Sequence, residues 1–183
     1  VKIVAERKDL TDDVKAKIPE GVDLVYWDYY HDDQSLYEKM FALHRELGKA
    51  PLFQGGIWTW GRLWANLPYS AINTNAGMQA CKVAGIREVI TSIWGDDGTE
   101  CDMFSALAGL QLVAEHAYAD DIDDKLLRQN FAGSCNADYD AWVKASALDV
   151  IPGVNDKSFS NVSKWMLWQD PLLSIMDPAV EGA

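Results

Sequence analysis

The sequence has little positive charge. Its 183 residues include 16 Lys and Arg against 28 Asp and Glu, and the formal net charge is -12. The basic residues do not cluster, whereas binding to nucleic-acid phosphates needs a concentrated basic surface. We therefore expect no nucleic-acid partner, while a neutral ligand would be indifferent to this charge.

Long apolar runs and regular cysteine spacings are also missing. No stretch of 18 apolar residues occurs, so we expect no membrane span and no membrane partner. The three cysteines, Cys81, Cys101 and Cys135, are far apart, odd in number and outside any metal-ligand spacing. They predict free thiols in a reducing compartment, so we expect a cytoplasmic location and no metal site.

Signal and cofactor motifs are equally scarce. The chain opens at Val1 without an initiator Met, a basic region or an apolar leader, which predicts that it was cut from a longer protein. The pair Gly55-Gly56 is too short for a phosphate loop and has no Lys-Ser or Lys-Thr after it. We therefore expect no cofactor.

Tryptophan, by contrast, is abundant, with eight residues. Aromatic faces stack on apolar ligands and on sugar rings, but they also fill protein cores. Composition alone leaves both interpretations open.

The pattern of apolar residues predicts strands alternating with helices. Strands rich in β-branched and aromatic residues are expected at 22–30, 52–60 and 88–94, and helices at 35–47, 73–84 and 103–118. Such alternation is typical of a parallel sheet covered by helices, and so of an α/β fold. After residue 119 only helical patterns remain, at 120–131 and 137–147, followed by an apolar tail at 164–176. We predict one domain at 1–119 and a small helical domain at 120–183.

Aromatic and acidic residues gather at the expected carboxyl ends of the strands. Side chains two positions apart share a face of a strand. This rule gives three pairs: Tyr26 with Asp28, Trp58 with Trp60, and Trp94 with Asp96. In parallel α/β folds, ligands bind at this end of the sheet. Rings that stack on a sugar and carboxylates that accept its hydroxyl hydrogens make these six residues candidates for a sugar site.

Each candidate also has a structural interpretation. A single Trp on an apolar strand is more often part of the core, and Asp96 could form a turn or cap the next helix. Asp28 is harder to explain in this way, because a lone buried carboxylate needs partners.

Four separated segments resemble the carboxyl-terminal half of family 20 glycoside hydrolases, closest to the bacterial exo-β-N-acetylglucosaminidases (β-N-acetylhexosaminidases). The similarity runs from about Asp12 to Asp177. The segments are LVYWDYYH, GGIWTWG, WGDDGTEC and SKWMLWQDPLL.

The resemblance implies a partial (β/α)8 barrel, holding strands six to eight with their helices, followed by a helical C-terminal domain. It implies N-acetylglucosamine-terminated glycans as partners and a substrate-assisted mechanism, in which the acetamido carbonyl forms an oxazolinium intermediate. Trp94 matches the Trp of a Trp-x-Glu motif, with Asp96 in place of the Glu. Tyr26 and Asp28 resemble a Tyr-x-Asp pair, although many members carry that pair on the seventh strand, which leaves their roles open.

The family's catalytic Asp-Glu pair, within a His-x-Gly-x-Asp-Glu motif, does not occur in this sequence. The resemblance therefore implies a fragment that supplies sugar-binding residues and no catalytic acid, and we expect the isolated chain to be inactive. A half barrel would expose its edge strands and inner face, which favours association, for example as a homodimer.

Three alternatives stay open at this stage. The chain could be a non-catalytic carbohydrate-binding module. It could be a retaining glycosidase that pairs Asp28 with Asp96 or Glu100. It could also have a purely structural role.

Overall fold

The computed structural model describes residues 11–48, 50–96, 98, 100–150 and 162–180. Within them the chain is an α/β protein with a three-stranded parallel sheet in the order β1-β2-β3. The strands are β1 (Val25–Trp27), β2 (Leu52–Ile57) and β3 (Val89–Ile93). Leu52 pairs with Val25, and Phe53 pairs with Val89, so the register is fixed across the sheet.

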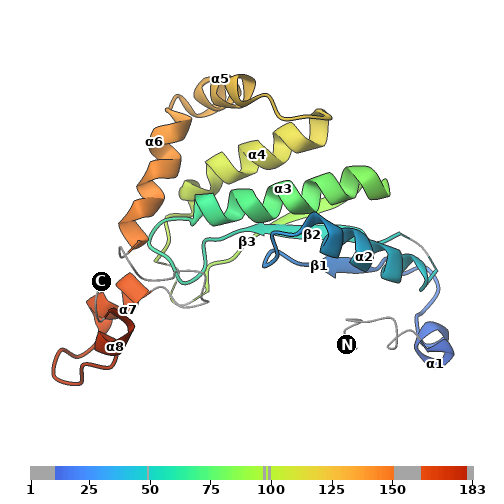
Figure 1. Ribbon diagram of the computed structural model, residues 1–183, viewed down its shortest axis with the longest axis horizontal. Coiled ribbons are helices and arrows are strands. Elements are labelled where there is room, and N and C mark those ends of the chain that lie inside the picture. The colour runs from blue at the N-terminus through green and yellow to red at the C-terminus, as the bar shows by residue number, and fades with distance from the viewer. Residues whose placement is uncertain (1–10, 49, 97, 99, 151–161, 181–183) are drawn as a thin grey trace.

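Helices connect and follow the strands. In chain order they are α1 (Asp12–Ala16), α2 (Gln34–Arg45), α3 (Leu67–Ala84), the 3-10 helix η2 (Met103–Ala106), α4 (Leu107–Tyr118), α5 (Asp124–Cys135), α6 (Tyr139–Lys144), the 3-10 helix η3 (Ala145–Asp149), α7 (Val162–Trp168) and α8 (Asp177–Val180). In Figure 1, α3 and α4 lie side by side along one side of the sheet, and α5 and α6 follow α4.

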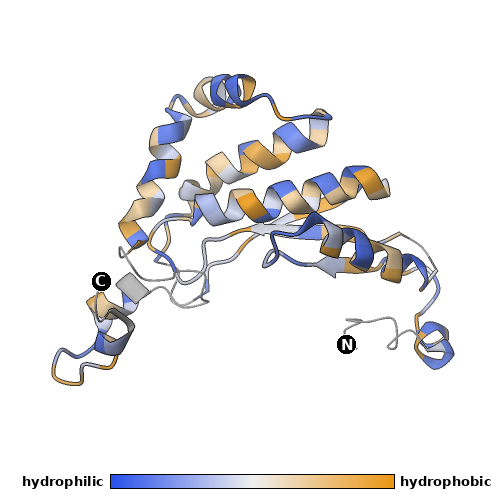
Figure 2. Ribbon diagram, viewed as in Figure 1, coloured by the Kyte–Doolittle hydropathy of each residue, from blue (hydrophilic) through white to orange (hydrophobic). Residues whose placement is uncertain are grey.

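The helix layer and the sheet share an apolar core. Tyr26 of β1 and Phe53 of β2 pack with Tyr37 and Phe41 of α2. Ile57, at the end of β2, packs against Gly109 of α4. Hydrophobic residues recur along α3 and α4 in Figure 2, as expected of helices whose faces cover a sheet.

The opposite face of the sheet is more open. The strand register puts Trp27, Gln54 and Ile90 on this face, and the Gln54 amide donates to Ser92 Oγ across it at 2.6 Å. Trp27 and Ile90 are exposed. The helices of the described residues therefore cover one face of the sheet and leave aromatic and apolar side chains on the other.

The strands are shorter than the sequence predicts. β1 ends at Trp27 because the Asp28 carboxylate accepts the Tyr30 N–H at 2.9 Å, which turns the chain. β2 ends at Ile57 because the Trp58 N–H donates to the Ser70 hydroxyl instead of to a neighbouring strand. Local side-chain acceptors thus end both strands before their aromatic runs end.

Helix α3 is longer than predicted, beginning at Leu67 instead of residue 73. Asn66 caps its first turn by accepting the Tyr69 N–H at 3.3 Å, and Pro68 lies within that turn, where a missing N–H costs nothing. Its end at Gly85 is as predicted, with a left-handed φ of 64°. The short helices α1 and α8 were not predicted.

The described residues after 119 form helices and turns. Phe131 of α5 is fully buried with Ile57 and Ala108, so α5 packs on the helix layer. The boundary predicted at residue 119 stays a prediction. The partial barrel likewise stays a prediction, because the described residues form three parallel strands with their helices and no closed barrel.

Candidate functional site

A cleft of about 240 Å³ opens at the carboxyl ends of the three strands. Six residues line it: Trp27, Tyr29, Tyr30, Trp60, Trp94 and Asp96. Five of the six are aromatic and the sixth is a carboxylate. Pockets for drug-sized ligands usually have volumes of about 300 Å³ or more, so this cleft suits a smaller ligand such as one sugar ring.

Two exposed indoles form one wall of the cleft. Trp27 is the last residue of β1 and Trp94 comes directly after β3, and their ring centroids are 5.8 Å apart with 39° between the planes. Trp27 is 54% exposed and Trp94 is 36% exposed. Trp27 is paired with Gln54 on the open face of the sheet, and Trp94 continues the open-face alternation of Ile90 and Ser92 just beyond β3.

Trp60 forms the inner part of the cleft. Its ring lies 4.8 Å from that of Tyr29 and 4.4 Å from that of Trp58, centroid to centroid. Trp58 is buried, and its indole N–H donates to the Tyr29 carbonyl at 2.8 Å. Trp58 therefore supports the cleft from behind, while Trp60 lines it.

Tyr29 lies at the centre of this aromatic group. Burial raises the pKa of its hydroxyl, helped by a hydrogen bond with Tyr30, while hydrogen bonds with Trp27 and Trp94 act in the opposite direction. The phenol therefore stays protonated at neutral pH. It can act as a neutral hydrogen-bonding group beside any ligand in the cleft.

The strand ends are tied to each other. The Thr59 hydroxyl donates to the Trp94 carbonyl at 2.7 Å, which joins the chain after β2 to the chain after β3. Asp96, two residues beyond Trp94, is exposed at the cleft. Among the described lining residues it is the one that carries a charge, so these residues offer an acceptor for hydroxyl hydrogens and no cation for an anionic ligand.

Tyr26 and Asp28 lie elsewhere. The Asp28 carboxylate is buried. It accepts hydrogen bonds from the Tyr26 hydroxyl at 2.5 Å and from the Tyr30 N–H at 2.9 Å, and it lies 2.7 Å from His31 Nδ1. Tyr26 packs among the α2 side chains, and burial followed by its bond to Asp28 raises its pKa. The structure therefore separates this pair from the cleft and gives the Asp28 carboxylate the partners that burial requires.

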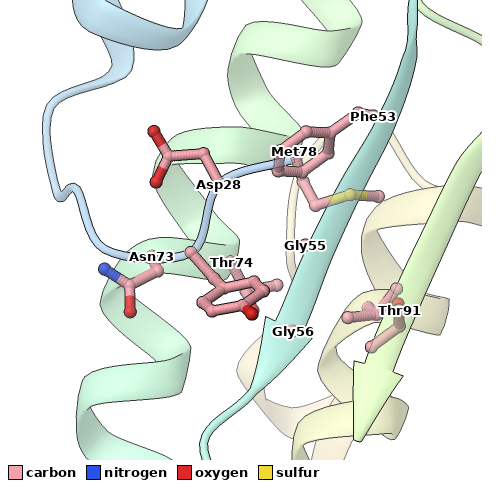
Figure 3. A pocket seen from close by; sticks show the side chains of 10 residues that line it. Asp28, Phe53, Gly55, Gly56, Asn73, Thr74, Met78 and Thr91 are labelled. Carbon is pink, nitrogen blue, oxygen red and sulfur yellow. The ribbon is translucent and has the colours of Figure 1, made fainter. Parts of the chain in front are cut away.

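Behind the cleft, a small cavity lies between β2 and α3. Its volume is about 10 Å³, room for about one water. Figure 3 shows the side chains around it, with Asp28 and Asn73 on one side and Thr91 on the other. The Asn73 side-chain oxygen is buried without a hydrogen-bond partner in the described structure, so a water here would satisfy it.

Four of the six predicted site residues thus lie in or directly behind the cleft: Trp60, Trp94 and Asp96 line it, and Trp58 supports it. Whether any of the six binds a ligand stays a prediction. Sequence reasoning missed Trp27, Tyr29 and Tyr30. The alternation along YWDYY puts Trp27 opposite to Tyr26, but only the register with Gln54 shows which of the two faces the cleft.

No group of three or more His, Cys, Asp or Glu side chains among the described residues could hold a metal ion. No helix in the same residues is both long and apolar enough to cross a membrane. All three cysteines carry free thiols.

Comparison with known proteins gives one match. Residues 140–183 match the family model named Glycoside Hydrolase 20C C-terminal domain. This match confirms the resemblance for the C-terminal region, and it begins within α6, after the residues that form the cleft. No curated protein matches the chain.

Proposed function

We propose that the whole chain is the C-terminal portion of a β-N-acetylhexosaminidase, because residues 140–183 match the family model of the Glycoside Hydrolase 20C C-terminal domain. Its parent removes terminal β-linked N-acetylglucosamine by substrate-assisted, retaining hydrolysis through an oxazolinium intermediate. In this proposal β1, β2 and β3 are strands six to eight of a (β/α)8 barrel. The chain supplies the sugar-binding residues, and the Asp-Glu pair comes from the remainder of the barrel.

The observation that carries the proposal is the aromatic cleft with its single carboxylate at the carboxyl ends of three parallel strands. A pyranose has apolar faces that stack on indole rings and hydroxyl groups that donate to a carboxylate. Trp27 and Trp94 offer exposed ring surface, and Asp96 offers the acceptor. Tryptophans that only filled the core would be buried, whereas Trp27 and Trp94 are both partly exposed and line the cleft together with Asp96.

The one-sided helix layer supports the barrel part of the proposal. In a (β/α)8 barrel, helices cover the outer face and the inner face is closed by the other strands. Here α2, α3 and α4 cover one face, while Trp27, Gln54 and Ile90 lie on the other.

A carbohydrate-binding module is the second candidate. It is favoured because all the described residues that line the cleft lie between Trp27 and Asp96 of this chain. The two candidates differ in ligand selectivity. A hydrolase that uses the acetamido group as nucleophile must recognise this group, whereas a stacking platform binds the sugar ring itself. The two-carboxylate glycosidase is less favoured, because the Asp28 carboxylate is buried among its own partners and Glu100 is bound to Lys164.

Calorimetric titration of the chain with N-acetylglucosamine and with glucose tests the proposal. We expect weak binding of N-acetylglucosamine, weaker or no binding of glucose, and about fivefold weaker binding of N-acetylglucosamine in Trp94→Ala. Equal affinity for both sugars would favour the binding module, and binding of neither would refute both candidates.

An activity assay supplies the second part of the test. With an aryl N-acetylglucosaminide as substrate, we expect no turnover by the isolated chain. Measurable hydrolysis would contradict the claim that the acid pair comes from outside it.

A further inference from the structure

We propose that the C-terminal segment, defined as residues 140–150 and 162–168, positions the two loops that carry the cleft residues, and that Asp149 and Lys164 are its positioning residues. The inference rests on the proposed function for the role of the cleft. Asp149 acts on the loop between β2 and α3, which carries Trp60. Lys164 acts on the loop after β3, which carries Asp96.

The Asp149 contact is a carboxylate that accepts consecutive backbone N–H groups. Asp149 lies at the end of η3 and is 3% exposed. Its oxygens accept the Leu63 N–H at 3.1 Å and the Trp64 N–H at 2.8 Å. Hydrogen bonds to a buried charged acceptor are stronger than neutral ones, so this contact restrains the backbone three and four residues after Trp60.

Neighbouring residues of η3 and α6 act on the same loop. The Ser146 hydroxyl donates to the Ala65 carbonyl at 2.7 Å and accepts the Leu67 N–H at 3.2 Å. The Trp142 indole packs on Trp64 with ring centroids 5.4 Å apart. The backbone from Leu63 to Leu67 therefore takes several of its hydrogen bonds from residues 79 to 86 positions later in the chain.

The Lys164 contact joins α7 to the other loop. Lys164 is fully buried, and its ammonium group donates to Glu100 at 2.9 Å. It also lies 5.2 Å from the ring centroids of both Trp165 and Trp168. Because a buried ammonium needs such partners, α7 and Glu100 hold each other in place, four residues from Asp96.

The two contacts have a common consequence. Asp149, Ser146 and Lys164 all lie within the matched C-terminal domain, whereas none of them lines the cleft. These residues therefore act on the cleft indirectly, by holding the backbone of Leu63 and Trp64 and the side chain of Glu100. Figure 1 shows α7 beyond the carboxyl ends of the strands, where this role requires it.

The test compares Asp149→Ala with Asp123→Ala. Asp123 caps α5 by accepting the Lys125 and Leu126 N–H groups and touches neither loop, so its loss destabilises the protein without acting on the cleft. We measure amide hydrogen exchange at Trp60 to Trp64 and the affinity for N-acetylglucosamine. Asp149→Asn, which keeps one acceptor oxygen, serves as the conservative variant.

We expect exchange at these amides to rise about tenfold or more in Asp149→Ala relative to Asp123→Ala, with Asp149→Asn between them and sugar affinity falling in the same order. Equal exchange in Asp149→Ala and Asp123→Ala would overturn the proposal. If the unmodified chain binds no sugar, the proposed function fails, and the exchange rates still decide whether Asp149 positions the loop.

Lys164→Met gives an independent variant should Asp149→Ala fail to fold. We expect faster exchange at Gly95 and Asp96, with exchange at Leu63 and Trp64 unchanged. Unchanged exchange at Gly95 and Asp96 would overturn the role of Lys164.

Discussion

Trp27 ends one outer strand of the sheet and Trp94 directly follows the other, yet their indole rings approach to 5.8 Å between centroids. Between these strands, the open face of β2 carries Gln54 and Gly56. A Cβ at Gly56 would lie 2.8 Å from the Tyr29 ring, so only glycine lets Tyr29 pack there. The small residues of β2 thus make room for the aromatic groups of its neighbours.

Trp27→Ala and Trp94→Ala should each weaken binding of N-acetylglucosamine by about 1 kcal/mol, which is about a fivefold loss of affinity. Both indoles are partly exposed, so their removal should change the free energy of unfolding little. Titration calorimetry measures the effect, and Tyr118→Ala is the control, because Tyr118 is an exposed aromatic residue outside the cleft. An equal loss of affinity in Tyr118→Ala would show that the cleft is not the binding site.

The same substitution should affect stability at Asp28 and sugar binding at Asp96. Asp28→Asn introduces an amide NH₂ among the buried groups that donate to the carboxylate, and should lower the free energy of unfolding by about 1–3 kcal/mol. Asp96→Asn changes an exposed residue and should leave stability nearly unchanged while it weakens sugar binding. Denaturant unfolding and calorimetry on both variants separate the two roles. Reduced sugar binding in a fully stable Asp28→Asn would instead support the role first expected for Asp28.

That contrast shows what the sequence could and could not predict. The alternation of strands and helices follows from apolar periodicity, and the three parallel strands agree with it. Trp94 and Asp96 could be found because a strand end followed by a turn is a local feature. The sequence could not show that Tyr26 faces the core and not the cleft, because this depends on the packing of α2 against β1. That packing brings Tyr37 and Phe41 against Tyr26.

The positioning contacts were beyond sequence reasoning for a similar reason. Asp149 is an ordinary residue at the end of a short helix, and its partners Leu63 and Trp64 are 85 or more residues away. No local pattern predicts such a contact. The sequence offered Glu100 only as a carboxylate of the alternative retaining glycosidase, and its pairing with Lys164, 64 positions later, could not be predicted from any local pattern.

Acid should destabilise the protein through His116. This side chain is buried between α3 and α4, where Nε2 lies 2.7 Å from Asn75 Oδ1 and Nδ1 lies 3.3 Å from the Lys82 ammonium. Burial, followed by the charge of Lys82, lowers its pKa from 6.5 to about 4. As pH falls from about 6.5 to about 4, His116 becomes protonated in the unfolded chain while it stays neutral in the folded protein. The free energy of unfolding should therefore fall by up to about 3 kcal/mol across this window.

Urea unfolding measured at a series of pH values tests this expectation. His116→Gln, which cannot titrate, should flatten the pH dependence between about pH 4 and 6.5. His31→Gln, at a half-exposed position, serves as the control and should retain it. A slope that survives in His116→Gln would assign the effect to other groups.

Gly77→Ala should destabilise the protein, although alanine favours helices. A Cβ at Gly77 of α3 would lie 2.6 Å from Phe53 Cζ and 2.9 Å from its Cε1, and Phe53 is buried between β2 and the helices. Either α3 must move away from the sheet or the ring must leave its position, which costs about 1–3 kcal/mol. Gly133→Ala in α5 is the matched control, because a Cβ there meets nothing within 4 Å. It should gain about 0.5–1 kcal/mol from helix propensity. Denaturant midpoints of the two variants should thus shift in opposite directions, and a gain in both would mean that α3 does not press on Phe53.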